Sequence, residues 1–170
     1  VIDCGANIGL FSAIASKKGA EVYAFEPDED IIRKYLKKTA DFNPNITIVN
    51  RALSDGTYRT FFAKSTNNLG GGNLTDDEKN ADFSVETITL DEWCENNNIK
   101  KIDYIKADIE GAERKLLQGA KRVLREMTPK LSICTYHLPD DKVVLEKIVR
   151  DANPQYEIKH DYKKMYAYIP

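Results

Sequence analysis

The first eleven residues, Val1–Phe11, constrain the fold more than any other stretch of the chain. They predict a short buried strand over Val1–Asp3, a turn of small residues over Cys4–Gly9, and a helix that begins near Leu10. Glycine adopts backbone angles that other residues avoid and lets a ligand approach the main chain closely. The N–H groups at the start of a helix can point at such a ligand. The stretch therefore predicts a ligand site where a strand is followed by a helix.

Strand-like and helical segments alternate along the rest of the chain. The predicted strands cover residues 1–3, 21–25, 46–49, 102–107, 131–136, 156–159 and 165–169. The predicted buried stripes are Ile31, Ile32, Tyr35 and Leu36 in the second helix, Leu116, Leu117, Ala120, Val123 and Leu124 in one later helix, and Val143, Val144, Ile148 and Val149 in the last. This spacing is typical of βαβ units and predicts an α/β fold with a parallel sheet.

An irregular segment interrupts this alternation. Thr57–Ala63 and Phe83–Ile88 read as two strands that pair as a hairpin. The polar stretch between them, Lys64–Asp82, includes Gly70 and is expected to be either a surface loop or a substrate lid. Thr89 then has the features of a helix N-cap.

Composition and charge exclude several classes of protein. A chain of 170 residues is expected to form one domain, 1–170, and its start on a core strand suggests that an N-terminal extension is missing. The net charge is −2 and no apolar run reaches about 20 residues, so we expect neither a nucleic-acid nor a membrane partner. The three cysteines favour reduced, buried thiols and a cytoplasmic location. No Cys/His spacing resembles a zinc site, and no metal is expected.

Polar residues follow each of the first five predicted strands of the alternating pattern. They are Asp3, Glu26, the pair Asn50-Arg51, the pair Asp108 and Glu110, and His137. Ligands of open parallel sheets bind beyond the carboxyl ends of the strands. These residues therefore predict one site along that edge.

The opening turn has the pattern Asp3-x-Gly5-x-Asn7-x-Gly9. This is not the G-x-G-x-x-G pattern of dinucleotide-binding enzymes. An acid at the strand end disfavours a diphosphate and suits a cationic group, so S-adenosylmethionine is the expected cofactor. The alternative is a tight turn that only connects the strand to the helix.

The next two strand ends suit the nucleoside part of that cofactor. Glu26, followed by Pro27, lies where an acid would accept hydrogen bonds from ribose hydroxyls. Backbone groups of Ala52 and Leu53 are expected to meet the adenine edge. The alternatives are a solvated loop acid and an ordinary connecting loop.

Three residues at the later strand ends are candidates for catalysis. Asp108, Glu110 and His137 can each accept a proton from a hydroxyl nucleophile, and Asp108 can also face the cofactor's ammonium group. Glu110 has an alternative role at the positive end of the next helix dipole, and His137 could be an ordinary loop residue. A divalent metal held by Asp108, Glu110 and His137 is the less favoured alternative to metal-free catalysis.

Five short runs of sequence carry a resemblance to a known family. They are VIDCGANIGLFS (1–12), AFEPD (24–28), NRALSD (50–55), VETITLDE (85–92) and IKADIEGAE (105–113). Together they resemble the FkbM-type S-adenosylmethionine-dependent methyltransferases, in order from Val1 to about Pro129. The resemblance implies a class I methyltransferase sheet of seven strands, the last antiparallel, with helices on both faces. It implies cofactor contacts from Asp3, Gly5, Asn7, Gly9, Glu26 and Asp108.

The expected function is O-methylation of a hydroxyl on a sugar, glycan or small natural-product acceptor. Two other classes stay open: an NAD-dependent oxidoreductase on a similar sheet, and a non-catalytic domain that binds a ligand or partner. The oligomeric state is not predictable from the sequence.

Overall fold

The computed structural model describes residues 1–65 and 71–170. Within this part the chain forms two compact units, one of Val1–Ala52 and Tyr58–Thr87, the other of Leu53–Thr57 and Ile88–Pro170. The expectation of a single domain, 1–170, stays a prediction. Among the helices of the described residues, none is both long and apolar enough to cross a bilayer.

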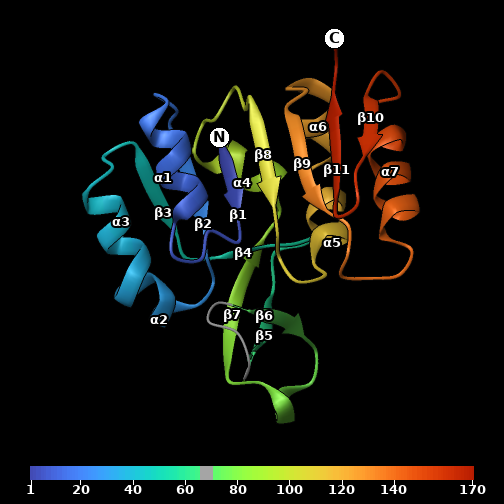
Figure 1. The fold of residues 1–170 in the computed structure, drawn as a ribbon. Coiled ribbons are helices and arrows are strands. Elements are labelled where there is room, and N and C mark those ends of the chain that lie inside the picture. The colour runs from blue at the N-terminus through green and yellow to red at the C-terminus, as the bar shows by residue number, and fades with distance from the viewer. Residues whose placement is uncertain (66–70) are drawn as a thin grey trace. The chain divides into compact units, whose positions relative to one another are not determined.

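The first unit contains three parallel strands that follow the predicted boundaries closely. Strand β1 (Ile2–Cys4) pairs with β2 (Val22–Phe25), and β2 pairs with β3 (Ile46–Val49). Figure 1 shows the three strands side by side, with helix α1 (Leu10–Lys17) and helix α3 (Lys37–Asp41) packed against them. The strands are rich in buried apolar residues, as expected for parallel strands covered by helices.

The second helix departs from the predicted phase because it contains a π-helical turn. It starts as α2 (Glu29–Ile31), continues as a π-helix over Ile32–Leu36 and ends as α3. In a π-helix the backbone hydrogen bonds join residues i and i+5. Ile31 and Leu36 are buried as predicted, whereas Tyr35, predicted to be buried, is 39% exposed.

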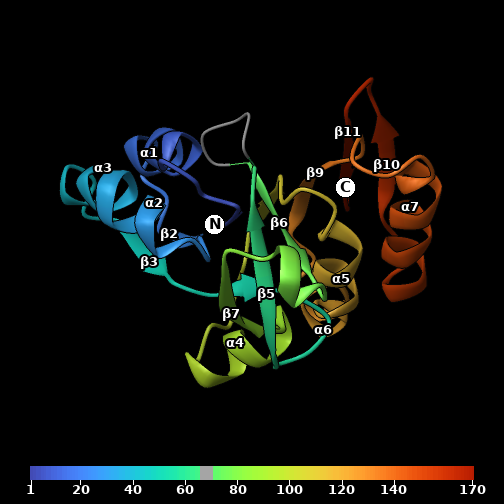
Figure 2. The ribbon, with the colours of Figure 1, turned by 90° about the horizontal axis from the view of Figure 1, so that it is seen from below.

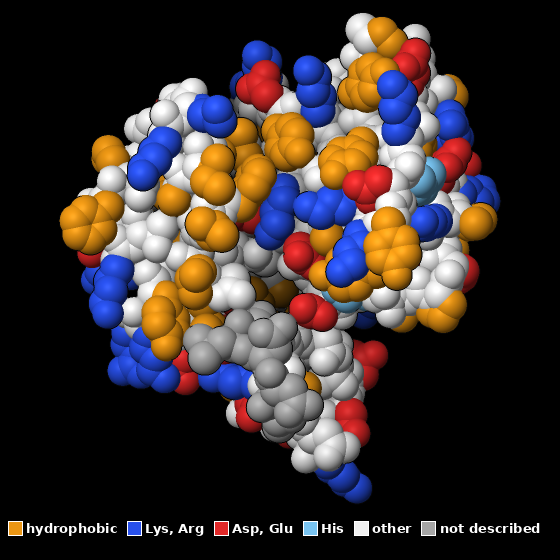
Figure 3. All heavy atoms as spheres, viewed as in Figure 1, with side chains coloured by type: hydrophobic (Ala, Val, Ile, Leu, Met, Phe, Trp, Pro, Cys, Tyr) orange, Lys and Arg blue, Asp and Glu red, His pale blue; other side chains and the backbone are white. Residues whose placement is uncertain are grey.

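Helix α1 buries its small polar residues and not its large apolar ones. Ser12 and Ser16 face the interior, whereas Leu10 and Ile14 are 67% and 50% exposed. Figure 3 shows apolar side chains gathered on the surface over this helix. The large apolar residues of α1 therefore lie on its outer side, because the small inner residues allow the helix to lie close to the strands.

The predicted hairpin is confirmed and carries a third strand. Strand β5 (Arg59–Lys64) pairs antiparallel with β7 (Phe83–Ile88), and β6 (Gly72–Thr75) pairs with the other edge of β5 (Figure 2). A short 3-10 helix (Glu78–Asn80) links β6 to β7. The polar loop predicted over Lys64–Asp82 is therefore wrong for residues 72–75, and Gly70 lies outside the described residues.

The second unit contains the remaining four strands of the predicted seven. Strand β8 (Tyr104–Ala107) is parallel to β9 (Lys130–Cys134), and β11 (Lys164–Tyr168) runs antiparallel to both β9 and β10 (Glu157–His160). The last strand is antiparallel, as predicted. The two-residue strand β4 (Ala52–Leu53) lies at the boundary of the units in the sequence.

Helices α4 (Leu90–Asn96), α5 (Glu113–Gln118), α6 (Lys121–Glu126) and α7 (Asp141–Ala152) complete this unit. The single helix predicted before Pro129 is split into α5 and α6. The break follows Gly119, where a Cβ atom would lie 2.0 Å from the Ser54 carbonyl oxygen. Close packing of another backbone segment therefore accompanies the interruption.

The buried face of α7 also differs from the prediction. Val149 is buried as predicted, but Asp141 and Leu145 face inward beside it, and Val143, predicted to be buried, is 73% exposed. Asp141 is buried because its carboxylate pairs with Arg114 of α5 at 2.8 Å. This ion pair holds the helix in a phase that hydrophobicity alone does not predict. The three cysteines are free and buried, as predicted.

Candidate functional site

The opening turn of the first unit folds over the end of β2. Gly5, Asn7 and Gly9 all have positive φ angles, of 73°, 51° and 85°. The N–H groups of Gly5 and Ala6 donate to the Phe25 carbonyl at 3.1 and 2.9 Å. These donors are engaged within the fold, so the turn has a defined shape before any ligand binds.

Glu26 is the residue that joins the turn to the end of β2. Its Oε2 accepts the Asn7 N–H at 2.8 Å and its Oε1 accepts the Asp28 N–H at 3.0 Å. The residue is only 7% exposed. Both oxygens of this buried carboxylate are therefore held by backbone N–H groups.

Asp3 lies beneath the turn and has no exposed surface. Its Oδ2 accepts the Ser12 hydroxyl of α1 at 2.6 Å. Because the Asp3 carboxylate is fully covered in this structure, its direct contact with a cationic ligand stays a prediction. Its negative charge can act on a ligand through the turn.

Gly9 has a packing role that the sequence analysis did not foresee. A Cβ atom at this position would lie 2.7 Å from Leu36 Cδ1 and 2.9 Å from Thr39 Cγ2. The Thr39 hydroxyl also donates to the Ile8 carbonyl at 2.6 Å. The glycine thus lets the second helix pack against the turn.

A cavity of about 270 Å³ opens beside Glu26 in the first unit. Its lining combines acids, bases and aromatic rings: Glu26, Asp28, Asp30, Ile31, Lys34, Tyr35, Phe62, Lys64, Ser65 and Gly71. Among the predicted site residues only Glu26 lines it. The cavity offers both carboxylates and ring faces to a ligand.

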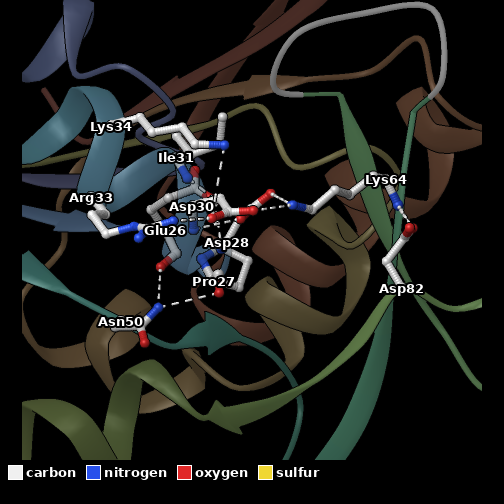
Figure 4. Close-up of polar contacts among 10 residues, drawn as sticks. All are labelled: Glu26, Pro27, Asp28, Asp30, Ile31, Arg33, Lys34, Asn50, Lys64 and Asp82. Atoms are coloured by element: carbon white, nitrogen blue, oxygen red, sulfur yellow. Dashed lines mark hydrogen bonds and ion pairs between the residues drawn. The ribbon is translucent and has the colours of Figure 1, made fainter.

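Lys64 is the central cation of this cavity (Figure 4). Its ammonium group lies 3.1 Å from Asp28 Oδ2 and 3.1 Å from Asp30 Oδ2, and its backbone N–H donates to Asp82 at 2.7 Å. Partial burial opposes the charge, but the hydrogen bonds to the two acids raise the pKa of Lys64. No local sequence pattern predicts this contact, because it joins residues of a helix start and a hairpin strand.

Asn50 holds the segment that follows β2. Its side-chain amide donates to the carbonyls of Glu26 at 3.0 Å and Pro27 at 3.2 Å (Figure 4). Asn50 therefore positions Glu26 and Pro27, a role that its place at a strand end does not predict. Ala52 is buried against Phe62 and Val85, and Leu53 is buried in the other unit.

The second unit brings the three predicted catalytic residues together. The Nε2 atom of His137 lies 3.6 Å from Asp108 Oδ1 and 3.4 Å from Glu110 Oε2. The Tyr136 hydroxyl donates to the same Asp108 oxygen at 2.9 Å. Asp108 and Glu110 are about two-fifths exposed, whereas the His137 side chain is 8% exposed.

Glu113 is a fourth member of this cluster that the sequence analysis missed. It is 1% exposed, and its two oxygens accept the N–H groups of Ile109 at 2.8 Å and Gly111 at 3.0 Å. Its Oε1 lies 3.1 Å from Nδ1 of His137. Glu110 and Gly111 have φ angles of 54° and 98°, which curl the backbone around this carboxylate. The sequence feature that could have identified Glu113 is its position at the end of the run DIEGAE (108–113).

The charges of the cluster change two pKa values. Burial disfavours the His137 imidazolium, but the nearby carboxylates of Glu113, Glu110 and Asp108 outweigh it and raise the pKa of His137. Burial, followed by the charge of Asp108, raises the pKa of the Cys134 thiol to about 12. Cys134 is therefore a neutral thiol and not a nucleophile at neutral pH.

The predicted residues thus form two groups. Gly5, Asn7 and Glu26 are linked by the turn of the first unit, and Asp108, Glu110 and His137 surround one imidazole in the second. A glycine turn after the first strand of a parallel sheet, with an acid after the second, is the arrangement of α/β enzymes that bind nucleoside cofactors.

Comparison with known proteins identifies the family of the chain. Residues 3–169 match the Methyltransferase FkbM domain. The chain therefore belongs to the FkbM methyltransferase domain family.

Two curated relatives and two solved structures are similar to it. The chain is 30% identical to hexuronic acid methyltransferase AglP of Haloferax volcanii, over 92% of this chain and 63% of the relative. It is 25% identical to 2-O-methyltransferase NoeI of Sinorhizobium fredii, over 73% of this chain and 58% of that protein. The chain thus spans less than two thirds of either relative.

Of the solved structures, an FkbM methyltransferase from Methylobacillus flagellatus is 26% identical, with a TM-score of 0.70 over 98% of this chain and 42% of that one. A putative methyltransferase from Streptococcus mutans in complex with SAH shares the fold at 12% identity, with a TM-score of 0.56 over 98% of this chain and 86% of that one. These likenesses establish a mixed α/β methyltransferase fold with mostly parallel strands.

Proposed function

We propose that this chain is an S-adenosylmethionine-dependent methyltransferase domain. The carrying observation is the turn in which Gly5, Asn7 and Glu26 converge at the ends of β1 and β2. Glu26 lines a cavity of about 270 Å³ and offers a carboxylate, the type of group that accepts hydrogen bonds from ribose hydroxyls. The SAH bound to the Streptococcus mutans relative is the product form of the same cofactor.

Each group of residues receives a role in this proposal. In the first unit, Glu26 and Pro27 hold the ribose, the backbone of Ala52 meets the adenine edge, and the turn of Gly5, Asn7 and Gly9 carries the methionine part, with the charge of Asp3 attracting its ammonium group. The cofactor contacts expected from Leu53 and Asp108 stay predictions. When bound, the cofactor supplies an electrophilic methyl group on a sulfonium.

We propose a hydroxyl of a sugar as the methyl acceptor. One curated relative is named for a hexuronic acid, which is a sugar acid, and the other for transfer to an oxygen at a 2-O position. A sugar hydroxyl is a weak nucleophile until it loses its proton. Asp108, Glu110 and His137 form the acceptor-side group that takes this proton, and orientation supplies much of the remaining rate.

A reducing compartment such as the cytoplasm fits this function. The three cysteines are free and buried. Burial raises the pKa of Cys94 to about 11, so this thiol is neutral and unreactive.

Calorimetric titration with S-adenosylhomocysteine tests the cofactor assignment. The wild-type chain is expected to bind it, and Glu26→Gln is expected to weaken binding about tenfold or more, because an amide replaces one acceptor oxygen for ribose (a charged hydrogen bond contributes about 1.5–3 kcal/mol). Glu29→Gln is the matched control, since Glu29 is exposed on the next helix turn and is expected to leave affinity unchanged.

Two results would overturn the assignment. One is binding of NADH without binding of S-adenosylhomocysteine, which would indicate an oxidoreductase. The other is equal affinity of the Glu26→Gln and Glu29→Gln variants, which would remove Glu26 from the site. Transfer of a labelled methyl group from S-adenosylmethionine to uronic acids and neutral sugars tests the acceptor separately.

A further inference from the structure

We propose that His137 and Asp108 bind a divalent metal ion, with Glu110 as a further ligand and buried Glu113 holding the imidazole from behind. Ligand atoms of Asp108 and His137 lie within 4.8 Å of each other and of the supporting Glu113, and Glu110 Oε2 lies 3.4 Å from Nε2 of His137. Metal–ligand bonds of about 2.0–2.2 Å place neighbouring ligand atoms roughly 3–4 Å apart. The side chains are therefore close to the spacing of a coordination shell without a change of backbone.

The environment of the His137 imidazole is a second indication of a bound ion. His137 is 92% buried at its side chain, and within residues 1–65 and 71–170 neither of its ring nitrogens makes a hydrogen bond of good geometry. Its Nε2 atom faces Asp108 Oδ1 at 3.6 Å and Glu110 Oε2 at 3.4 Å. These distances are too long for hydrogen bonds and suit ligands that share one ion.

Glu113 decides which ring nitrogen binds the ion. Both of its oxygens already accept backbone N–H groups, from Ile109 and Gly111, and Oε1 lies 3.1 Å from Nδ1 of His137. A buried carboxylate beside Nδ1 favours a proton on that nitrogen, so a bound ion takes the place of the second imidazolium proton, at Nε2. Metal-binding histidines are commonly oriented by a carboxylate in this way. Glu113 is therefore a positioning residue, and Nε2 is the ligand.

The donor set indicates the kind of ion. Carboxylate oxygens suit Mg²⁺ and Mn²⁺, and an imidazole nitrogen shifts the preference toward transition metals such as Mn²⁺. Asp108 and Glu110 are about two-fifths exposed, so the ion would keep open positions for oxygen ligands. If the proposed function holds, adjacent hydroxyls of a sugar are the natural occupants, and the ion would lower the pKa of the bound hydroxyl.

Paramagnetic NMR on the full chain tests the site without any cofactor or acceptor. The chain contains two histidines, His137 and His160. His160 lies 2.9 Å from Glu146 and serves as an internal control that also has a carboxylate beside it. Titration with Mn²⁺ is expected to broaden the imidazole signal of His137 at concentrations that leave His160 sharp. Equal broadening of both signals, or no broadening at millimolar Mn²⁺, overturns the proposal.

Variants separate the ligands from the supporting carboxylate. His137→Asn and Asp108→Asn are each expected to weaken Mn²⁺ binding at least tenfold. Binding is measured by electron paramagnetic resonance, which detects the free Mn²⁺. His160→Asn is expected to leave it unchanged. Glu113→Gln should weaken binding about 10–100-fold while keeping the stoichiometry, whereas an unchanged affinity removes the positioning role.

The same samples distinguish this proposal from the proposed function. A chain that binds S-adenosylhomocysteine but not Mn²⁺ disproves the metal site and leaves the cofactor assignment standing. A chain that binds Mn²⁺ at His137 but not S-adenosylhomocysteine does the reverse. Circular dichroism of each variant shows whether the fold is retained. If His137→Asn fails to fold, the broadening pattern of the wild-type chain still decides the question.

Discussion

Replacing Gly9 by alanine should destabilise the first unit through two separate effects. Gly9 has a φ angle of 85°, a conformation that costs a residue with a side chain roughly 1–2 kcal/mol. The new Cβ atom would also lie 2.7 Å from Leu36 Cδ1 and 2.9 Å from Thr39 Cγ2. Overpacking of this kind costs about 1–3 kcal/mol. The expected loss of unfolding free energy is the sum, about 2–5 kcal/mol.

Gly19 provides a control that separates the two effects. Its φ angle is 86°, almost the same as that of Gly9, but a Cβ atom there would have no neighbour within 4 Å. The Gly19→Ala variant should therefore lose only the backbone part, roughly 1–2 kcal/mol. The difference between the two variants measures the crowding at Leu36 and Thr39.

Urea unfolding followed by circular dichroism measures both variants. With a slope of about 2 kcal/mol per M of urea, Gly9→Ala should unfold about 0.5–1.5 M earlier than Gly19→Ala. Equal midpoints for the two variants would refute the packing argument. If Gly9→Ala then still abolished binding of S-adenosylhomocysteine, the glycine would be required for approach of the ligand and not for approach of the helix.

Two further predictions concern ion pairs and caps. Lys64→Met should lower stability by about 0.5–1 kcal/mol near neutral pH, measured by thermal unfolding across pH. The hydrogen bond from Lys64 is the largest cause that lowers the pKa of Asp30, so this contribution is present above the ordinary value of 3.8 and is lost as pH falls through the lowered pKa. The pKa of Lys64 is raised, so its contribution is complete below 10.5 and is lost as pH rises through the raised value. A penalty that did not shrink below about pH 4 would contradict the ion pair. Asp91→Ala should cost about 1–2 kcal/mol, because its carboxylate accepts the N–H groups of Arg122 and Val123 at 2.8 and 2.9 Å and caps α6, whereas Glu95→Ala on the exposed face of α4 should change urea stability by less than about 0.5 kcal/mol.

The sequence predicted the strands well because each is a short run of buried apolar residues bounded by turn signals. Ile46–Val49 and Phe83–Ile88 match their predicted bounds. Helix faces were less predictable. Tyr35 was predicted to be buried together with Leu36, but in this π-helical segment Leu36 is buried and Tyr35 is exposed. A period is a local property, whereas the phase of a helix depends on what packs against it.

The candidate site shows the same division between local and long-range information. The opening turn and Glu26 were recognisable because their residue types are restricted by backbone geometry and by position at strand ends. Glu113 was not, since an acid four residues before Leu117 reads as a helix-start residue until Gly111 and Ile109 are seen to bond it. Lys64 was not recognisable either, because its partners, Asp28 and Asp30, lie far from it in the sequence, at the start of the second helix.

The π-helical turn over Ile32–Leu36 makes chain length a constraint in its own right. An α-helix turns about 100° per residue, so removing one residue while this turn keeps its π-helical hydrogen bonds would rotate everything after it by roughly that angle. Thr39 would then leave the Ile8 carbonyl, and Leu36 would leave Gly9. Many substitutions keep this geometry, but a single-residue insertion or deletion does not. Related chains are therefore expected to vary in composition between Ile31 and Lys37 while keeping the same number of residues.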